Sequence, residues 1–529
     1  MNKKKIKNPI LPGFHPDPSI IRVNDDYYIA TSTFEWFPGV EIHHSKDLIH
    51  WHLVSRVLTR QSQINMIGEP CSSGVWAPCL TYHQGVFYLV YSDLKTITGP
   101  YKDLKNYFVT TTDILGEWSD PIYLNGSGFD PSFFHDDDSH YILNMIWDHR
   151  KGSNHKGRFG GIIIQEYSTS EKKLIGPVTT IFKGTDLKVT EGPHLYKRDG
   201  YYYLLCAEGG TGPGHAVTLA RSKNLVGPYE VCPYNPILTT RDHPDFFFQR
   251  CGHGDIVETQ NGEWYMVHLC SRPSPVKKRS ILGRETAIQK IMWDNDGWFR
   301  LQSGGRLPEK YVEAPDLTEI SWPKLPERDN FTSKKLNIMY QTLRQPFDES
   351  ILSLTERPGF LRLKGQYSLH SNFTQALIAR RQQAFRYRAR TCVEFLPSTY
   401  QQMAGLVALY DTENYYYLHV TWDEELGICL KIANCDDGTL HYCEEGSIPL
   451  KQKGIHLEIN VDYEVLTYAY SCNGDQWHKI GSFYDASILS DEYGKAGHFT
   501  GAFIGICAQD ISGASLFADF DYFEYNDFP

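Results

Sequence analysis

Residues 129–147, FDPSFFHDDDSHYILNMIW, contain the unit that recurs through the first half of the chain. An acid beside a proline precedes a short apolar run, a polar turn and a second run rich in aromatic residues. Asp and Ser favour tight hairpin turns, so the stretch predicts two antiparallel strands. The HDDD segment at residues 135–138 also resembles a calcium-binding loop, but its place between two strand-like runs favours the turn.

The same pattern occurs five times, beginning near GFHPDPSII, WAPCL, FDPSFF, EGPHLY and GHGDI. The equivalent positions are residues 17, 76, 130, 191 and 253, which are 54 to 62 residues apart. A repeat of this length, built from about four strands, is typical of a propeller blade. Helical periodicity is almost absent, so the sequence predicts an all-β fold with a five-bladed β-propeller over residues 1–306.

Three of the five equivalent positions hold acids: Asp17, Asp130 and Glu191. The innermost strands of a propeller enter the central channel from the same end, so these three side chains are expected to converge. Like charges brought together in a cleft resist ionisation, which is costly unless function uses it. Asp17 alone, between two prolines, would suit a turn, but the repeat predicts a catalytic role.

A cluster of three carboxylates suits the cleavage of glycosidic bonds. That reaction needs an acid for the leaving oxygen and a base for water, and a neighbouring carboxylate raises the pKa of the acid. A metal site is the alternative, because hard cations also prefer clustered oxygens. Aromatic residues near the acids favour a sugar over a bare cation; they are Phe14, Phe129, Trp76 and Trp147.

Composition narrows the class of protein. With 529 residues, 41% hydrophobic and 22% charged, the chain suits a soluble globular protein of two or three domains. The net charge of -11 argues against nucleic acid as a partner, and no run of about 18 apolar residues predicts a membrane span. The 12 cysteines show no metal-ligand spacing, and no signal peptide is recognisable, which predicts reduced thiols and a cytoplasmic location.

Beyond the repeats, four prolines mark residues 307–330 as an extended linker. Alternating apolar and polar residues in ARTCVEFLP, AGLVALYD and NYYYLHVTW then predict a two-sheet β-sandwich, concanavalin-like or jelly roll, over residues 331–529. This domain has two interpretations, a lectin-like binding module or a structural buttress. We favour the buttress, with one loop that reaches the active site.

The motifs NPILPGFHPDPSI, YYIATSTFEWFPGV, WAPCL, GFDPSFFHDDD, TEGPHLY, AEGGT and LGRET, in this order, resemble glycoside hydrolase family 43. The resemblance is closest to its bacterial two-domain β-xylosidase group, whose C-terminal domain resembles RPGFLRLKG, FTGAF and ADFDYFEY. It implies a five-bladed propeller and an inverting mechanism. It further implies that Asp17 is the general base, Glu191 the general acid, and Asp130 the acid that tunes and orients Glu191.

Further site residues follow from the resemblance. Arg284 in LGRET corresponds to an arginine that binds sugar hydroxyls; a surface ion pair with Glu285 is the alternative. Phe34 and Trp76 correspond to rings that line the pocket, for which core packing is the alternative. Trp147 lies in a similar position, although its local motif, MIWDHR, is less diagnostic.

Two histidines are also candidates. His253 occupies the fifth blade's central position, where it supports Asp17 by hydrogen bonding or ligates a cation in the channel, with calcium as the candidate ion; both interpretations stay open. The related β-xylosidases have a pocket-closing aromatic before FTGAF, where this chain has His498. If His498 replaces that ring, the rim of the pocket is more polar. Acid–base cleavage of an acetal requires no cofactor.

These features predict exo-acting hydrolysis of β-1,4-xylo-oligosaccharides from the non-reducing end, with release of xylose. An α-L-arabinofuranosidase or a bifunctional enzyme is the nearest alternative, because the two sugars present similar hydroxyl arrangements. A retaining hydrolase and a non-catalytic carbohydrate-binding propeller are further alternatives. Exposed Tyr and Phe on two β-domains, together with the resemblance, predict a homo-oligomer, either a dimer or a tetramer.

Overall fold

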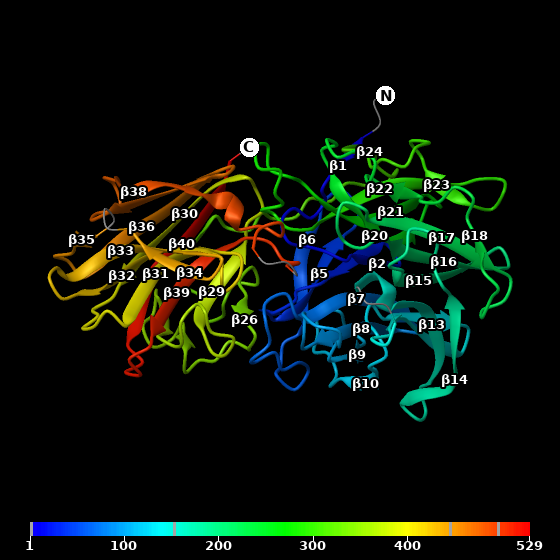
Figure 1. Cartoon of the computed structure of the whole chain (residues 1–529), viewed down its shortest axis with the longest axis horizontal. Helices are drawn as coiled ribbons and strands as arrows, with labels where there is room; N and C mark the ends of the chain where they lie inside the picture. Colours follow the sequence, from blue (N-terminus) through cyan, green and yellow to red (C-terminus); the bar gives the residue numbers. More distant parts are fainter. Residues whose placement is uncertain (1–3, 152–154, 444–446, 495–497, 529) are drawn as a thin grey trace.

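Two β-rich lobes make up the molecule, seen side by side in a computed structural model of the chain (Figure 1). The structure describes residues 4–151, 155–443, 447–494 and 498–528. Within these ranges the helical elements are the short 3-10 turns η1 (His155–Arg158) and η3 (Ala486–Ile488). All other regular elements there are strands, which confirms the predicted all-β class.

Five antiparallel sheets follow one another along the first lobe and form the blades of a propeller. Within each sheet the first strand in sequence lies innermost and the later strands lie progressively outward, as the predicted repeat requires. The blades are β2 (Ser19–Val23), β3 (Asp26–Thr31), β5 (Gly39–Ser45) and β6 (His52–Leu58); β7 (Gly74–His83), β8 (Val86–Leu94), β9 (Leu104–Thr111) and β10 (Ile122–Asn125); β11 (Ser132–Asp136), β12 (Ser139–Trp147), β13 (Phe159–Ser168) and β14 (Lys173–Phe182); β15 (Glu191–Arg198), β16 (Tyr201–Glu208), β17 (Ala216–Ser222) and β18 (Glu230–Val231), with β19 (Leu238–Thr239) also paired to β17; and β20 (Gln249–Glu258), β21 (Trp264–Ser271), β22 (Glu285–Trp293) and β23 (Phe299–Leu301).

Tight turns join the first two strands of each blade. The HDDD segment forms the turn between β11 and β12, where Asp136 pairs with Ser139 across the hairpin. Asn24, Gln84 and Asp137 adopt positive φ values of 54°, 47° and 52° in three of these turns. Hairpin turns require this left-handed backbone, which Asn and Asp tolerate better than most residues.

One buried carboxylate on blade five ties the ring of blades together. Asp255 Oδ2 accepts hydrogen bonds from the Ser19 hydroxyl at 3.0 Å and from the Ile20 N–H at 2.8 Å, both on blade one. The Tyr196 hydroxyl on blade four donates to Asp255 Oδ1. The Asp255 side chain therefore links blade five to blade one, which closes the ring, and also to blade four.

The second lobe is a sandwich of two antiparallel sheets. One contains β25 (Arg328–Asp329), β27 (Leu352–Ser353), β28 (Leu361–Lys364), β40 (Phe517–Asp527), β30 (Arg386–Glu394), β36 (Gly454–Asp462), β37 (Val465–Ser471) and β38 (His478–Asp485). The other contains β29 (Ala376–Arg381), β39 (Phe503–Asp510), β31 (Gln402–Leu409), β32 (Tyr415–Asp423), β33 (Gly427–Asp436), β34 (Thr439–Tyr442) and β35 (Ile448–Pro449). Their inner faces bury one apolar core, as sandwich packing requires.

The segment predicted as a linker contributes a strand to each lobe. β24 (Tyr311–Glu313) pairs with the N-terminal strand β1 (Lys5–Lys7) beside blade five. At the other end of the segment, β25 pairs with β40 of the sandwich. The connection is thus fixed to both lobes by backbone hydrogen bonds.

The two lobes also share a short sheet. β4 (Trp36–Phe37), in the first blade, pairs with β26 (Thr342–Leu343), which precedes the sandwich strands. Trp36 stacks on Phe503 of β39 with ring centroids 3.6 Å apart. Both contacts lie beside the chain segment that carries Asp17, so the second lobe is held against the end of the propeller where the predicted acids lie.

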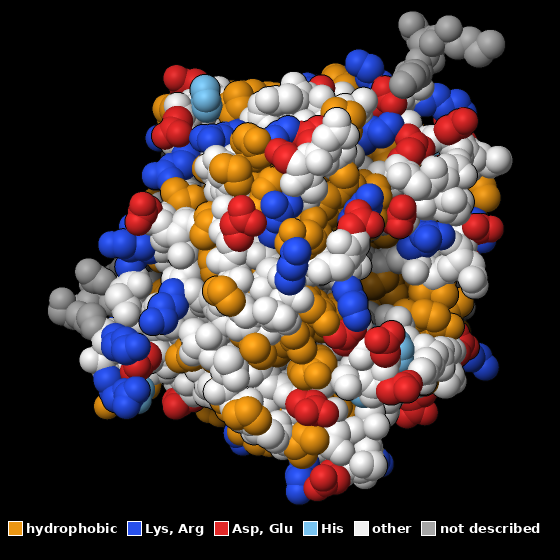
Figure 2. Space-filling view, turned by 90° about the vertical axis from the view of Figure 1, so that its right-hand side faces the viewer, with side chains coloured by type: hydrophobic (Ala, Val, Ile, Leu, Met, Phe, Trp, Pro, Cys, Tyr) orange, Lys and Arg blue, Asp and Glu red, His pale blue; other side chains and the backbone are white. Residues whose placement is uncertain are grey.

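Charged side chains of both signs are scattered over the face of the molecule shown in Figure 2, rather than gathered by sign. Such a surface, with a net charge of -11, is unlike the basic footprint of a nucleic-acid-binding protein. Among the described residues, we find no helix with the length and apolar character needed to cross a bilayer.

Candidate active site

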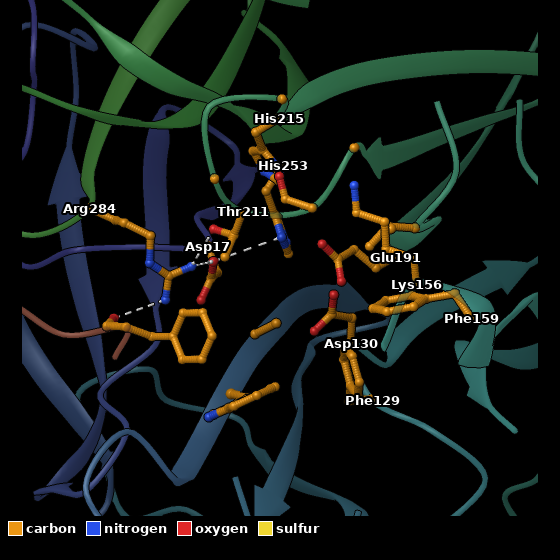
Figure 3. Close-up of a pocket in the computed structure, with 18 of the residues that line it drawn as sticks. Asp17, Phe129, Asp130, Lys156, Phe159, Glu191, Thr211, His215, His253 and Arg284 are labelled. Atoms are coloured by element: carbon orange, nitrogen blue, oxygen red, sulfur yellow. Dashed lines mark hydrogen bonds and ion pairs between the residues drawn. The ribbon is translucent and has the colours of Figure 1, made fainter. Parts of the chain in front are cut away.

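A cavity of about 570 Å³ opens at the end of the propeller where the innermost strands begin. Asp17, Asp130 and Glu191 line this cavity, and their carboxyl groups point toward a common space (Figure 3). Three different blades supply them, which is the convergence that the repeat predicts. We call this cavity the acid pocket.

Asp17, just before β2, is buried and has a positive φ of 54°. Its Oδ2 accepts from the Ser32 hydroxyl at 2.7 Å, and its Oδ1 accepts from Arg284 Nη1 at 3.0 Å. His253 Nδ1 lies 3.8 Å from Oδ1. Burial acts to raise the pKa of Asp17, but the Arg284 guanidinium, His253 and the Ser32 hydroxyl outweigh it and hold the pKa below its usual range. Asp17 is therefore ionised near neutral pH.

Asp130 and Glu191 have the opposite electrostatics. Burial, followed by the neighbouring Asp130 and Asp17 carboxylates, raises the pKa of Glu191 well above its usual range. Asp130 Oδ2 accepts from the Gly192 N–H at 3.0 Å, which places it against the backbone next to Glu191. Burial and the Asp17 charge raise the pKa of Asp130 as well. The Asp130–Glu191 pair therefore retains a proton at a pH where Asp17 has lost its own.

Arg284 lies between the acids and the second lobe. Its Nη1 donates to Asp17 and, at 3.2 Å, to the Thr211 hydroxyl, while its Nη2 donates to the Phe499 carbonyl at 3.0 Å. Arg284 is buried, and Glu285 is paired instead with Arg272. The alternative of a surface ion pair between Arg284 and Glu285 is therefore wrong.

Aromatic rings form one wall of the acid pocket. Phe34 lies 5.8 Å from Trp76 and 6.4 Å from Phe499 between ring centroids, and Trp76 lies 5.4 Å from Phe129. All four residues line the cavity. Rings opposite hydrogen-bonding groups suit a sugar, which has apolar C–H faces and polar hydroxyls.

Ser72 connects this wall to the second lobe through three of its atoms. The Ser72 hydroxyl accepts from the Phe499 N–H, its carbonyl accepts from Trp76 Nε1, and its N–H donates to Glu35 Oε2, each at 3.0 Å. Phe499 is thus held from both sides, by Ser72 at its N–H and by Arg284 at its carbonyl. The sandwich therefore supplies a wall of a pocket whose acids belong to the propeller.

Residues 6–299 match the protein-family model of glycosyl hydrolases family 43, and residues 328–526 match that of the beta xylosidase C-terminal concanavalin A-like domain. The chain belongs to glycosyl hydrolase family 43. This confirms the predicted family, the propeller and the concanavalin-like type of the sandwich. As a member of this family the chain is a glycosidase.

Three relatives show how far the similarity extends. A crystal structure of xylan beta-1,4-xylosidase from Bacillus halodurans C-125 superposes with a TM-score of 0.97 at 55% identity, over 99% of this chain and 100% of that one. A beta-xylosidase of Bacillus subtilis (strain 168) is 51% identical over 99% of this chain and 100% of its own length. Xylosidase/arabinosidase 43B of Humicola insolens is 48% identical over 98% of this chain and 97% of its own length.

Trp147 and His498, which were both predicted to bind substrate, do not line the acid pocket. Trp147 packs behind Phe129, with ring centroids 6.2 Å apart, and its indole N–H donates to the Pro100 carbonyl at 2.9 Å. The ring of His498 turns toward Asp411, with 3.2 Å between Nδ1 and Oδ2. The expected polar rim at residue 498 is therefore absent, because the next residue, Phe499, faces the pocket.

His253 lines the acid pocket beside Asp17. Burial lowers the pKa of His253 to about 4, although the nearby Asp17 acts to raise it, so the imidazole is neutral. Among the described residues, the group with metal-ligand spacing is formed by His15, Glu41 and His43, and it does not include His253. A calcium ion at His253 stays a prediction, whereas the contact with Asp17 gives the histidine a supporting position.

The sequence did not single out Lys102 and Thr211, which also line the pocket. Thr211 belongs to the quoted AEGGT motif, where its contact with Arg284 gave no separate signal. Lys102 Nζ lies 5.7 Å from the Trp76 ring and 5.4 Å from the Trp147 ring, and burial lowers its pKa to about 8. Nothing in the local sequence around Lys102 marks it as a pocket residue.

Proposed function

We propose that the protein is an exo-acting, inverting β-xylosidase that releases xylose from the non-reducing end of β-1,4-xylo-oligosaccharides. One observation carries the proposal: in a single pocket, the pKa of Asp17 is held low while that of Glu191 is raised. Two carboxyl groups whose environments separate their pKa values are suited to act as base and acid. The names of the relatives support xylose as the sugar.

In the proposed reaction, protonated Glu191 donates its proton to the glycosidic oxygen as the bond to the anomeric carbon breaks. Ionised Asp17 removes a proton from the water that attacks this carbon on the opposite face of the ring. Asp130 contributes through its charge, which favours the protonated form of Glu191. Each turnover consumes one water, and the two carboxyl groups must then exchange one proton with solvent before the next cycle.

The terminal xylose would lie against the rings of Phe34 and Trp76, with hydroxyls within reach of Arg284. Phe499, from the sandwich, narrows the pocket at the Arg284 end. A pocket closed in this way accepts a chain end, whereas an endo-acting enzyme needs an open groove. These features support exo action.

Inversion requires room for a water between the acid and the base. Carboxyl groups roughly 6.5–9.5 Å apart allow this, whereas retention uses about 5–5.5 Å. The test is ¹H NMR of the hydrolysis of nitrophenyl β-xyloside in its first minutes, because this substrate releases a single xylose whose first anomer is set by the enzyme. Inversion produces α-xylose first, and initial formation of β-xylose would overturn it.

An α-L-arabinofuranosidase, or a bifunctional enzyme, is the second candidate, because the Humicola insolens relative carries both activities in its name. Parallel rates on nitrophenyl β-xyloside and nitrophenyl α-arabinofuranoside distinguish the two functions. We expect a higher kcat/KM on the xyloside, and a large preference for the arabinoside would refute our first choice. A second pair, 1,4- and 1,3-linked xylobiose, tests the linkage.

The remaining expectations belong to the same proposal. The enzyme acts in the cytoplasm on short imported oligomers and assembles as a dimer or tetramer. Light scattering that returned the chain mass of 60.7 kDa at micromolar concentration would contradict assembly. Catalysis by two carboxyl groups requires no cofactor, so chelator treatment should leave activity intact unless a cation in the channel supports Asp17.

A further inference from the structure

A second cavity, of about 710 Å³, lies between the two lobes on the other side of the segment that carries Asp17. The N-terminal segment, blade one, residues 321–325 and the end of β29 enclose it. Its charged side chains are one acid, Glu41, and three cations, Lys324, Arg380 and Arg381. His15, His43, His50, His52, Ser321 and Gln383 complete the polar lining, and Trp51 and Trp322 add aromatic surface.

Two arginines share the single carboxylate of Glu41. Arg56 Nη2 lies 2.8 Å and Arg381 Nη1 lies 2.5 Å from Glu41 Oε1, and His15 Nε2 lies 3.2 Å from Oε2. Arg381 belongs to the sandwich, whereas the other three residues belong to the propeller. The buried group therefore spans the interface with one more guanidinium than carboxylate.

Several atoms of this group lack a hydrogen-bond partner. They include Arg56 Nη1, Arg381 Nη2, His15 Nδ1 and His43 Nδ1, and these four residues are 8%, 5%, 4% and 6% exposed. Buried polar atoms in proteins nearly always have a partner, either another protein group or an ordered molecule such as water. Unpartnered guanidinium N–H groups can only donate, so they call for an acceptor.

The charge balance distinguishes between two kinds of ligand. His15, Glu41 and His43 have the spacing of a metal site, but a divalent cation would add two positive charges beside two buried guanidiniums. Burial lowers the pKa of Arg381 to about 10, and the Arg56 charge acts in the same direction despite the opposing effect of Glu41. The group already has too few negative charges, which excludes a cation and favours an anion.

We propose that this interlobe cavity binds a small oxyanion, either a phosphate or the carboxylate of a sugar acid. Arg381, which lines the cavity, donates to its oxygens through Nη2, as guanidinium groups do with phosphate and carboxylate elsewhere. Arg56 lies outside the cavity lining and adds its positive charge through the Glu41 group. His43, whose Nδ1 lacks a partner, supplies a further polar contact. The bound anion completes the charge balance of the Glu41 group.

Such a ligand would contact the support of the catalytic base. Arg381 Nε donates to the Phe14 carbonyl at 2.5 Å, and the His15 N–H donates to the Arg284 carbonyl at 2.9 Å. Both bonds hold the segment in which Asp17 lies two residues after His15. Binding of the anion in the interlobe cavity should therefore change kcat/KM of the enzyme as well as its unfolding free energy.

Isothermal titration calorimetry on the full chain at constant ionic strength tests the site, with inorganic phosphate in one arm and glucuronate in another. We expect saturable one-to-one binding of at least one probe, weakened at least tenfold by Arg381→Gln. Arg386→Gln is the matched control, because it removes a guanidinium that lies 2.9 Å from Asp462, on the sandwich outside the cavity. The control should bind as the wild type does.

His43→Asn is the second variant, in case Arg381→Gln does not fold; it should also weaken binding at least tenfold. Circular dichroism checks the fold of each variant. Binding unchanged in the folded cavity variants, no binding of either probe to the wild type, or tight binding of Zn²⁺ in their place would overturn the proposal. Addition of the bound probe at saturation should shift kcat/KM at least twofold in the wild type and in Arg386→Gln, but not in the cavity variants.

Discussion

The acid pocket and the Glu41 group bury carboxylates beside arginines within one molecule, yet they reach opposite electrostatic states. In the pocket, burial and then the neighbouring carboxylates raise the pKa values of Asp130 and Glu191, and the single Arg284 is shared by three acids. In the Glu41 group, two arginines share one acid, and its pKa is held well below its usual range. Burial raises the carboxyl pKa in both groups, and the number of guanidiniums per acid decides whether that rise is overcome.

The largest effects should come from the two reacting carboxyl groups. We expect Asp17→Ala and Glu191→Gln each to lower kcat on xylobiose by roughly 10²–10⁴-fold, the range for loss of a general acid or base. Nitrophenyl xyloside separates their roles, because its leaving group needs little protonation. Glu191→Gln should recover much of its rate on that substrate, whereas Asp17→Ala should not. Equal recovery in both variants would contradict the assignment of acid and base.

Glu41→Gln tests the other half of the comparison through stability. Removing this charge leaves Arg56 and Arg381 without a buried counter-charge, which should cost about 3–5 kcal/mol of unfolding free energy. Burial acts to raise the pKa of Glu41, but Arg381 and Arg56 lower it more. The contribution of ionised Glu41 to the unfolding free energy is therefore fully present above the pKa that Glu41 has in the unfolded chain. It is lost as pH falls through the lower pKa of the folded state. The difference from wild type in urea unfolding should accordingly shrink below about pH 4.5.

Glu394→Gln is the matched control for that variant. Glu394 also pairs with an arginine, Arg357 at 2.8 Å, but it lies at the surface of the sandwich with 22% of its side chain exposed. A surface pair is worth about 0–1 kcal/mol. A loss as large for Glu394→Gln as for Glu41→Gln would show that burial is not what separates the two groups.

Asp130→Asn probes the pKa of Glu191 directly. Burial is the largest cause of the raised Glu191 pKa and stays in place, but the contribution from the Asp130 charge is removed. The alkaline limb of the kcat/KM profile, where Glu191 loses its proton, should move to lower pH. The acid limb of the profile, which is set by Asp17, should stay within a few tenths of a pH unit of its wild-type position. A shift of the alkaline limb to higher pH would be incompatible with the tuning role.

Ser72→Ala should give the smallest effect. It removes the hydroxyl that accepts from the Phe499 N–H, while both backbone bonds of Ser72 remain. One lost hydrogen bond is worth about 1 kcal/mol, or roughly fivefold, and we expect it mainly in KM for xylobiose. Ser73→Ala is the control, because the Ser73 hydroxyl donates to the Pro70 carbonyl instead. A similar rise of KM in both variants would point to a general disturbance of the loop.

The repeat predicts much of the propeller because each blade is a local unit. Turn residues such as Asn24 and Asp137 and the strands beside them lie within a few residues of one another, so the pattern is visible in a short window. Equivalent positions of a closed ring must converge, so the repeat also predicts Asp17, Asp130 and Glu191 in one pocket. This convergence does not depend on any contact between distant segments.

The parts that were missed depend on such contacts. Phe499 and His498 are neighbours in the chain, and only the packing of the sandwich on blade one determines which ring faces the pocket. Trp147 lies behind Phe129 of its own blade and donates to the Pro100 carbonyl of the preceding blade, a contact that no local motif records. The pairing of Glu41 with Arg381 joins residues 340 positions apart, and neither belongs to a recognisable motif.

The placement of Phe499 has a consequence for biosynthesis. Roughly 480 residues separate it from Asp17, and at about 5–20 residues per second the ribosome needs roughly 25–100 s to make that stretch. During this interval the propeller can fold with its three acids in place, yet without the ring that Arg284 and Ser72 hold. The nascent chain therefore gains a closed pocket only near the end of translation, and a chain cut short before Phe499 has its acids open to water.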